Sequence, residues 1–486
     1  MSFILKRHIP LTYVRHKLAP ISGSVETSDA SPLYAARREL EEETTLTSSS
    51  LRLRRQGKPF SFVDEALSRE WTIYPFAFDL IPTDQGGKGK EEIVTDWEHE
   101  SWGWYDPRSV KDDDKFGGVP HLATSLRRSW FEYDLGDGAG GVLAAGLQAL
   151  QEDHESGARV LAGKALEILA DVLVALNTED RGEWWKYART AAWHLWKNGR
   201  ESMGAAILNV VLTGLREIEA AVLPKWDGSS RKDRETSIRT ALLKYGESRM
   251  GINDNISQSF RSFLDATYSA SRPVRILTLS SSSTISKCLL NVINSGTQTF
   301  DIRVLESRPL FEGASMAATL ANAITQANTP EGNGSTVMVY TDAAAAIASK
   351  DVDLVLLGAD IISSNGDTCN KTGSLPAVLS ARHVSPDVKV VVVADREKVF
   401  PFPPPEREEN DRVEVTATWS SGGSSQAAKA FQSPENGSVV KNVYFEWVDS
   451  SLIDNYVLED GHKKAGEISE IEKSVKKAAG HFFDDL

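Results

Sequence analysis

The chain has 486 residues, of which 41% are hydrophobic, and this length predicts two or three domains. Asp and Glu number 68 against 54 Lys and Arg, and the resulting net charge of −14 argues against bulk nucleic-acid binding. Two cysteines are too few for a disulfide framework, and no apolar run is long enough to cross a membrane. We therefore expect a cytoplasmic protein, with the nucleus as an alternative.

Residues 1–135 predict a small α+β domain. Strand-like apolar patterns occur at 3–7, 71–80 and 102–106, and a helical pattern covers Leu33–Glu43. The next segment, GDGAGG at 136–141, has no side chain that would hold a regular element, so we expect a linker there.

The remainder of the chain predicts two further parts. Apolar spacing over 142–271 is helical and indicates a helical subdomain. Over 272–486, short apolar runs alternate with helical stretches; the runs are 274–280, 300–307, 336–342, 353–360 and 388–395. Such apolar strands are typical of a parallel sheet covered by helices, so the predicted fold class is α/β, ending in a Rossmann-like sheet.

A charged run, ARRELEEE, lies on the helix predicted near the N-terminus. Glu39, Glu42 and Glu43 stand at i, i+3 and i+4, which places three carboxylates on one helical face. Oxygen ligands of this kind suit Mg²⁺ or Mn²⁺, which can bridge a diphosphate and activate the attacking water. The alternative is a solvated helical face, a common meaning of such runs.

The segment GSVETSDASPLYAARRELEEETTL resembles the Nudix box, and EHESWGWYDP at 98–107 resembles a later strand of that family. The resemblance implies a Nudix fold and hydrolysis of a nucleoside diphosphate linked to another group. It also implies that Glu42 and Glu43 are catalytic and that both, with Glu39, bind the metal ion.

The segment departs from the Nudix pattern at two positions. Asp29, with a one-residue insertion, replaces the glutamate in the first half of the pattern. Thr45 replaces the glycine that follows the helix, and a β-branched residue suits positive φ poorly. These departures put the geometry of the loops in doubt and leave the helix intact.

Polar residues follow two of the predicted parallel strands. Asp360 ends an apolar run and should project from the carboxyl edge of the sheet, where open α/β sheets bind ligands. A carboxylate there can move protons at a sugar carbon. The run 280–284, SSSST, offers hydroxyls and backbone N–H groups at a helix N-terminus, which suits an anion.

The segment LVLLGADIISSNGDTCNKTGSLPAVLSARH at 354–383 resembles the signature of one isomerase and translation-factor family. That family includes methylthioribose-1-phosphate isomerase, ribose-1,5-bisphosphate isomerase and the alpha, beta and delta subunits of translation initiation factor 2B. Further matches follow in the family's order at 153–166, 199–209, 275–284, 305–317, 339–347 and 445–461. The resemblance implies a homodimer formed through this part of the chain, and a ligand site that includes Arg200, Ser280, Ser281, Arg308, Asn370 and Lys371.

Ser280 occupies the position at which the isomerases of this family carry a catalytic cysteine. A serine hydroxyl is a far poorer acid or base than a thiol with a pKa of ~8.5, so aldose–ketose proton transfer loses one of its two groups. The regulatory initiation-factor subunits also lack this cysteine. We expect Cys288 and Cys369 to be structural.

The leading hypothesis is a Mg²⁺-dependent Nudix-type hydrolase of a nucleoside-diphosphate-linked compound, fused to a module that binds a phosphorylated sugar or nucleotide. One alternative is a non-enzymatic, translation-factor-like regulatory subunit, in which Thr45 and Ser280 mark two decayed sites. Another is a ribose-phosphate isomerase that uses Asp360 without the usual cysteine. The sequence leaves the three hypotheses open.

Overall fold

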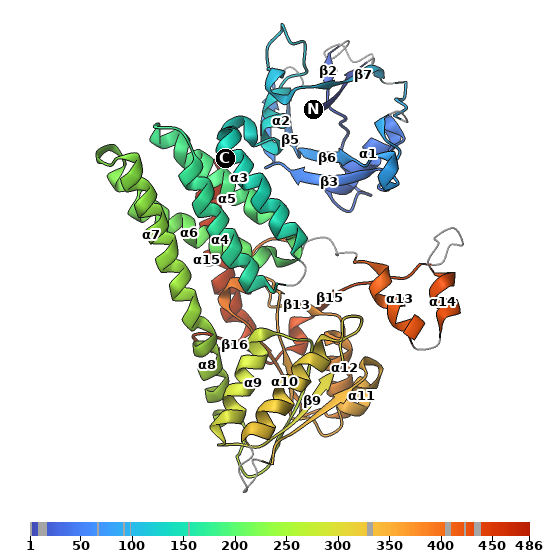
Figure 1. Cartoon of the computed structure of the whole chain (residues 1–486), viewed down its shortest axis with the longest axis vertical. Coiled ribbons are helices and arrows are strands. Elements are labelled where there is room, and N and C mark those ends of the chain that lie inside the picture. Colours follow the sequence, from blue (N-terminus) through green and yellow to red (C-terminus); the bar gives the residue numbers. More distant parts are fainter. Residues whose placement is uncertain are drawn as a thin grey trace.

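The computed structural model describes residues 2–7, 17–65, 68–90, 93–97, 99–153, 156–327, 334–403, 410–421, 424–431 and 439–486. It is a mixed α/β protein in which N-terminal strands, long helices and a parallel-rich sheet follow one another along the chain (Figure 1). No helix in the described ranges is both long enough and apolar enough to cross a membrane.

The N-terminal region consists of short antiparallel strands around one helix, α1 (Pro32–Thr44). In order along each sheet, the strands are β2 (Leu18–Ala19), β1 (Ser2–Arg7) and β7 (His99–Tyr105); β3 (Leu51–Gln56) and β6 (Phe76–Leu80); and β4 (Phe60–Asp64) and β5 (Arg69–Ile73). The helix predicted at Leu33–Glu43 and the strands at 3–7 and 102–106 are confirmed. The run 71–80 is divided between β5 and β6, because Pro75 cannot donate to a ladder.

The glycine-rich segment 136–141 lies inside a helix, α3 (Glu132–Glu152). Gly136 has φ 73° and ψ 170° and bends the helix, and a Cβ on Gly140 would lie 2.9 Å from the Glu132 Cα atom. The expectation that this segment holds no regular element is wrong for 137–141, which are helical because the buried face of α3 holds them, with Leu143 fully buried; at Gly136 the chain does depart from helical geometry. A domain boundary at 136–141 stays a prediction.

Buried polar contacts join the N-terminal strands to the helices. Arg55 on β3 forms an ion pair of 2.7 Å with Glu132 on α3. The Asn198 side chain at the end of α5 (Arg181–Asn198) pairs with the Gln56 backbone, accepting from its N–H at 2.7 Å and donating to its carbonyl at 2.9 Å. These contacts fix the N-terminal region on the helical one.

The helical prediction for 142–271 is confirmed in the described residues. Besides α3 and α5, the helices of this region are α4 (Ala158–Ala175), α6 (Gly204–Ala221), α7 (Arg231–Ser248) and α8 (Ile252–Thr267). A further long helix, α15 (Ala465–Phe483), lies near the C-terminus. The buried apolar faces of these helices, α8 excepted, form a single cluster that continues into one face of the sheet, and the buried residues of α8 belong to a second cluster on the other face.

The described residues of the C-terminal region form a sheet with strand order β10-β9-β8-β11-β14-β16-β17. Its strands are β8 (Val274–Leu279), β9 (Phe300–Leu305), β10 (Thr336–Tyr340), β11 (Leu354–Leu357), β14 (Lys389–Val393), β16 (Asn455–Leu458) and β17 (Gly461–Lys463). Neighbours from β10 to β16 are parallel, and β17 is an antiparallel edge. The five predicted apolar runs are thus confirmed as parallel strands, in the doubly wound order.

Shorter elements complete the carboxyl side of this sheet. A small antiparallel sheet contains β12 (Ile361–Ile362), β13 (Thr368–Lys371) and β15 (Phe445–Val448). The remaining helices of the C-terminal region are α9 (Ser283–Ser295), α10 (Glu312–Ala327), α11 (Ala345–Ala348), α12 (Ser374–Val384), α13 (Arg412–Ser421) and α14 (Ser425–Ala430). The hydrophobic pattern of the sequence did not predict β12, β13 and β15.

Candidate functional site

The strand order reverses between β8 and β11. The chain leaves β8 toward β9 on one side and leaves β11 toward β14 on the other, so their carboxyl ends flank a topological switch point. Open α/β sheets bind ligands at such a point. Ser280–Ser282 follows β8, and Gly358–Asp360 follows β11.

The turn after β8 is held in an uncommon conformation. Ser280 has φ 63°, in the left-handed region that non-glycine residues seldom enter. Its N–H donates to the Ser307 hydroxyl at 2.7 Å. Ser282 then caps α9, accepting from the Ile285 N–H at 3.4 Å. The turn therefore directs the start of α9, a natural anion position, toward the switch point.

Asn370 on β13 reaches the same point. A Cβ on Gly358 would lie 3.4 Å from both the Asn370 Oδ1 atom and the Ser282 hydroxyl, so glycine lets these two polar groups approach the backbone. The Asn370 amide donates to the Ser374 hydroxyl at 2.9 Å, which fixes its orientation. The structure thus brings together the predicted residues Ser280 and Asn370 with Ser282. Ser281 lies exposed in the same turn.

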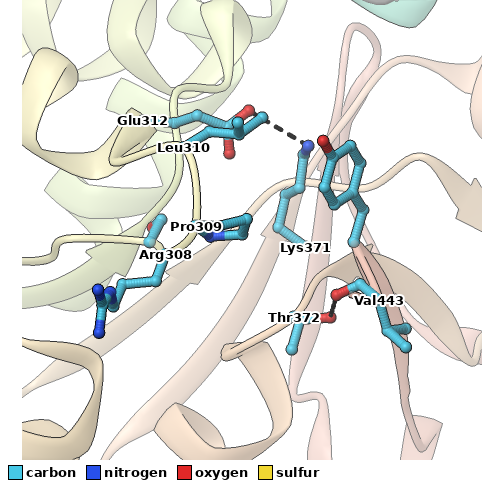
Figure 2. Close-up of a pocket in the computed structure, with 9 residues that line it drawn as sticks. Arg308, Pro309, Leu310, Glu312, Lys371, Thr372 and Val443 are labelled. Atoms are coloured by element: carbon cyan, nitrogen blue, oxygen red, sulfur yellow. Dashed lines mark hydrogen bonds and ion pairs between the residues drawn. The ribbon is translucent and has the colours of Figure 1, made fainter. Parts of the chain in front are cut away.

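A shallow pocket that is open to solvent lies beside this point. Lys371 and Glu312 face each other across it, with 3.2 Å between Nζ and Oε1 (Figure 2). The second Glu312 oxygen lies 3.5 Å from the Ser280 hydroxyl. The pocket is lined by Ser307, Arg308, Pro309, Leu310, Glu312, Lys371, Thr372, Val443 and Tyr444.

The two predicted arginines do not share an anion position with Lys371. Figure 2 shows the Arg308 side chain pointing away from Lys371, and its guanidinium donates to the Thr418 hydroxyl on α13. Arg200, in the helical region, donates to the Asp153 carbonyl at 2.7 Å and so fixes the turn after α3. The structure therefore gives both arginines partners within the protein.

In the N-terminal region, Arg38 is the centre of the charged face of α1. It donates from Nε and Nη2 to the two carboxylate oxygens of Asp29, at 3.2 and 3.1 Å, and from Nη1 to Glu39 and Glu42, at 2.8 and 3.1 Å. The hydrogen bond from Arg38 lowers the pKa of Asp29. Thr45 ends α1 with φ 61°, so it adopts the left-handed conformation that suits glycine better.

Glu43 points away from this group. Its carboxylate is buried and lies 2.6 Å from the Nε2 atom of buried His99 on β7. Within the described ranges, no group of three or more His, Cys, Asp and Glu side chains lies close enough to hold a metal ion. In this arrangement Glu39 and Glu42 accept from Arg38 while Glu43 faces His99, and the binding of Mg²⁺ or Mn²⁺ by the three glutamates stays a prediction.

Family profiles match both ends of the chain. The profile of the Initiation factor 2 subunit family matches residues 154–464, which is more than half of the chain. The chain belongs to the Initiation factor 2 subunit family. A NUDIX domain profile matches residues 3–124, so this family member also carries a NUDIX domain.

Curated relatives of this family member include two methylthioribose-1-phosphate isomerases. The protein from Enterobacter sp. (strain 638) is 33% identical over 168 residues, or 33% of this chain and 44% of its own length. The protein from Vitis vinifera is 27% identical over 186 residues, or 36% of this chain and 44% of its own. The match therefore spans less than half the length of these relatives.

Solved structures of similar proteins include eIF2B beta from Chaetomium thermophilum. It is 15% identical, with 73% of this chain and 96% of that chain covered and a TM-score of 0.49. The 5-methylthioribose 1-phosphate isomerase from Pyrococcus horikoshii OT3 is 18% identical, with 69% and 87% covered and a TM-score of 0.48.

Within the part that matches the Initiation factor 2 subunit family, Asp360 lies beside a lysine that the sequence did not single out. Its carboxylate is 3.7 Å from the Nζ atom of Lys398, which follows β14 and is largely buried. Lys398 ends the segment VVVADREK, and a charge just after an apolar strand is the signal that would have marked it. Glu312 was also missed, although it lies within the family match at 305–317 and begins a helix.

Both cysteines are unreactive in this environment. Burial raises the pKa of the Cys288 thiol to about 11. Burial, with the Asp360 and Glu446 carboxylates nearby, raises the pKa of the Cys369 thiol to about 12. A thiol with such a pKa stays protonated near neutrality. Neither cysteine can therefore take the part of the catalytic cysteine that the isomerases carry at the position of Ser280.

Proposed function

We propose that the C-terminal region binds a phosphorylated sugar or nucleotide at the switch point between β8 and β11. The observation that carries this proposal is the meeting of Ser282, Gly358 and Asn370 at the start of α9, with Lys371 next along β13. The start of α12 is less available to an anion, because the Glu446 carboxylate already accepts from its N–H groups.

Each group has a chemical part in this proposal. Backbone N–H groups at the start of α9, with serine hydroxyls, donate to the phosphate. Asn370 and Asp360 bind sugar hydroxyls, and the Lys371 ammonium neutralises phosphate charge. Isomerisation is not part of the proposal, because Ser280 stands where the isomerases carry a thiol. The curated relatives are isomerases of a sugar phosphate, which supports this ligand class.

Calorimetry on the full chain with ribose 5-phosphate and AMP tests the proposal. Lys371→Met should weaken binding by about 1.5–3 kcal/mol, as loss of a hydrogen bond to a charged group would. Arg308→Ala should cost less, because its guanidinium turns toward Thr418. The control is Lys473→Met, which removes a lysine from an exposed ion pair with Glu470 on α15. Absence of binding by the unmodified chain would reject the proposal.

Hydrolysis by the NUDIX domain is the second candidate function. The charged face of α1, held by Arg38 and Asp29, and the profile match favour cleavage of a nucleoside-diphosphate-linked compound. Because Glu43 lies against His99, a metal ion that needs all three glutamates would have to draw Glu43 out of that pair. A homodimer through the C-terminal region and the non-enzymatic regulatory role stay predictions.

A further inference from the structure

Glu312 occupies a position in which an anion is favoured from three sides. It is the first residue of α10, so its carboxylate lies at the positive end of that helix. Its two oxygens lie 3.2 Å from the Lys371 ammonium and 3.5 Å from the Ser280 hydroxyl. These are two of the groups proposed to bind a ligand phosphate, so a carboxylate of the chain itself is already placed among them.

Lys371 is held in this position by more than Glu312. Its Nζ atom lies 4.7 Å from the centre of the Tyr444 ring and 4.9 Å from that of Phe445, which are cation–π distances. The Tyr444 hydroxyl in turn donates to Glu414 on α13. The ammonium is therefore anchored at the pocket, and a ligand has to meet it there.

The charges around the pocket are nearly balanced. Among the described residues that line it, Lys371 and Arg308 are positive and Glu312 is negative, and Arg308 points away. A ligand anion that reaches Lys371 therefore competes with the Glu312 carboxylate for the same ammonium. A ligand carboxylate would replace one monoanion with another, so its binding free energy would benefit little from Lys371. A phosphate brings up to two negative charges and three acceptor oxygens, so its binding is strengthened more.

We propose that Glu312 is a specificity-determining residue, an internal anion that admits phosphate esters to Lys371 and excludes carboxylates. The inference rests on the proposed binding function and deepens it. The ion pair itself contributes little to stability, because both side chains are partly exposed, at 21% for Lys371 and 29% for Glu312. Its effect lies in the choice between ligands.

The test compares Glu312→Gln with the unmodified full chain by calorimetry, using ribose 5-phosphate, ribonate and ribose. The variant should bind ribose 5-phosphate about 3- to 10-fold more tightly and gain more for ribonate, so that the preference for phosphate over carboxylate falls. Affinity for uncharged ribose should not change. Glu470→Gln removes the acid of an exposed Glu–Lys pair on α15, with the same change of charge, and should behave as the unmodified chain.

A second variant guards against a folding defect. Glu312→Asp keeps the charge but shortens the side chain, so it should shift the preference in the same direction and by less. If Glu312→Gln has an unchanged or stronger preference for phosphate, or binds ribose 5-phosphate more weakly, the inference is overturned while the proposed function stands. If neither the unmodified chain nor the variants bind ribose 5-phosphate, the proposed function fails and the inference fails with it.

Discussion

The NUDIX domain and the parallel sheet both gather charged side chains, but by different means. On α1, Arg38 bonds to Glu42, one turn farther along the same helix, and to Glu39, its neighbour in the sequence. At the sheet, Ser280, Glu312 and Lys371 come from separate segments that the strand order brings to one edge. Spacing along a helix sets the face on which a side chain lies, whereas topology also sets the partners that it meets.

The sharpest test of this contrast is catalysis by the NUDIX domain. If the domain is a hydrolase, Glu42→Gln should reduce Mg²⁺- or Mn²⁺-dependent cleavage of ADP-ribose, nucleotide sugars or dinucleotides by orders of magnitude, because a metal-binding carboxylate is lost. Glu41→Gln, at an exposed position on the same helix, is the matched control. Equal turnover by Glu42→Gln would remove the carboxylate mechanism and leave α1 as a solvated helix.

The junction between the two regions should be the next most sensitive place. Asn198→Ala leaves the partly buried Gln56 backbone groups without their side-chain partner, at a cost of about 1–3 kcal/mol. In thermal unfolding, the first transition should occur at a lower temperature. Asn177→Ala, at an exposed position, should change the free energy of unfolding by less than about 0.5 kcal/mol. An unchanged transition in Asn198→Ala would show that the N-terminal region is not held by this contact.

The same junction should weaken in acid. Burial, followed by the nearby Arg55 charge, lowers the pKa of His194 to about 3, and its Nδ1 lies 2.8 Å from the Asn198 amide. The unfolded chain takes up a proton at this histidine below about pH 6.5, and the folded chain does not until about pH 3. The contribution of neutral His194 to stability is therefore complete above pH 6.5 and declines as pH falls toward 3.

Melting temperatures at pH 7 and pH 5 test this prediction. His194→Gln removes the titrating group, so the loss of stability between the two values should be smaller than in the unmodified chain. His383→Gln, at an exposed position, should leave the pH dependence as it is. A variant at His194 with the full acid sensitivity of the unmodified chain would contradict the assignment.

The smallest expected effect concerns isomerisation at the sheet. A coupled assay with ribose phosphates should find no activity, or very slow activity, because Ser280 is a poor acid or base. Ser280→Cys is the change expected to raise the rate, and Asp360→Asn should abolish any gain. If the unmodified chain isomerises efficiently and Asp360→Asn abolishes that activity, the result would instead support the isomerase hypothesis.

Local patterns predicted the elements well and the contacts between them less well. Helix α1 and the five apolar strands follow from hydrophobic periodicity, and Asp360 at a strand end follows from the parallel sheet. The pair of Glu43 and His99 could not be predicted, because it depends on how β7 lies against α1. Glu312 was not predicted for the same reason, because its contact with Lys371 depends on β13 lying beside the start of α10.

The path of α3 through its glycines has a practical consequence for dividing the protein. A cut within 137–141 would fall in the helical part of α3 that follows the kink at Gly136, next to Ala139, Leu143 and Leu147, which are almost fully buried. A fragment that keeps this helix whole has to begin upstream of Phe131, whose side chain is fully buried. The connection between the NUDIX domain and the rest of the chain thus runs through a helix that is kinked at Gly136, and the buried residues on either side of the kink belong to the core of the helical region.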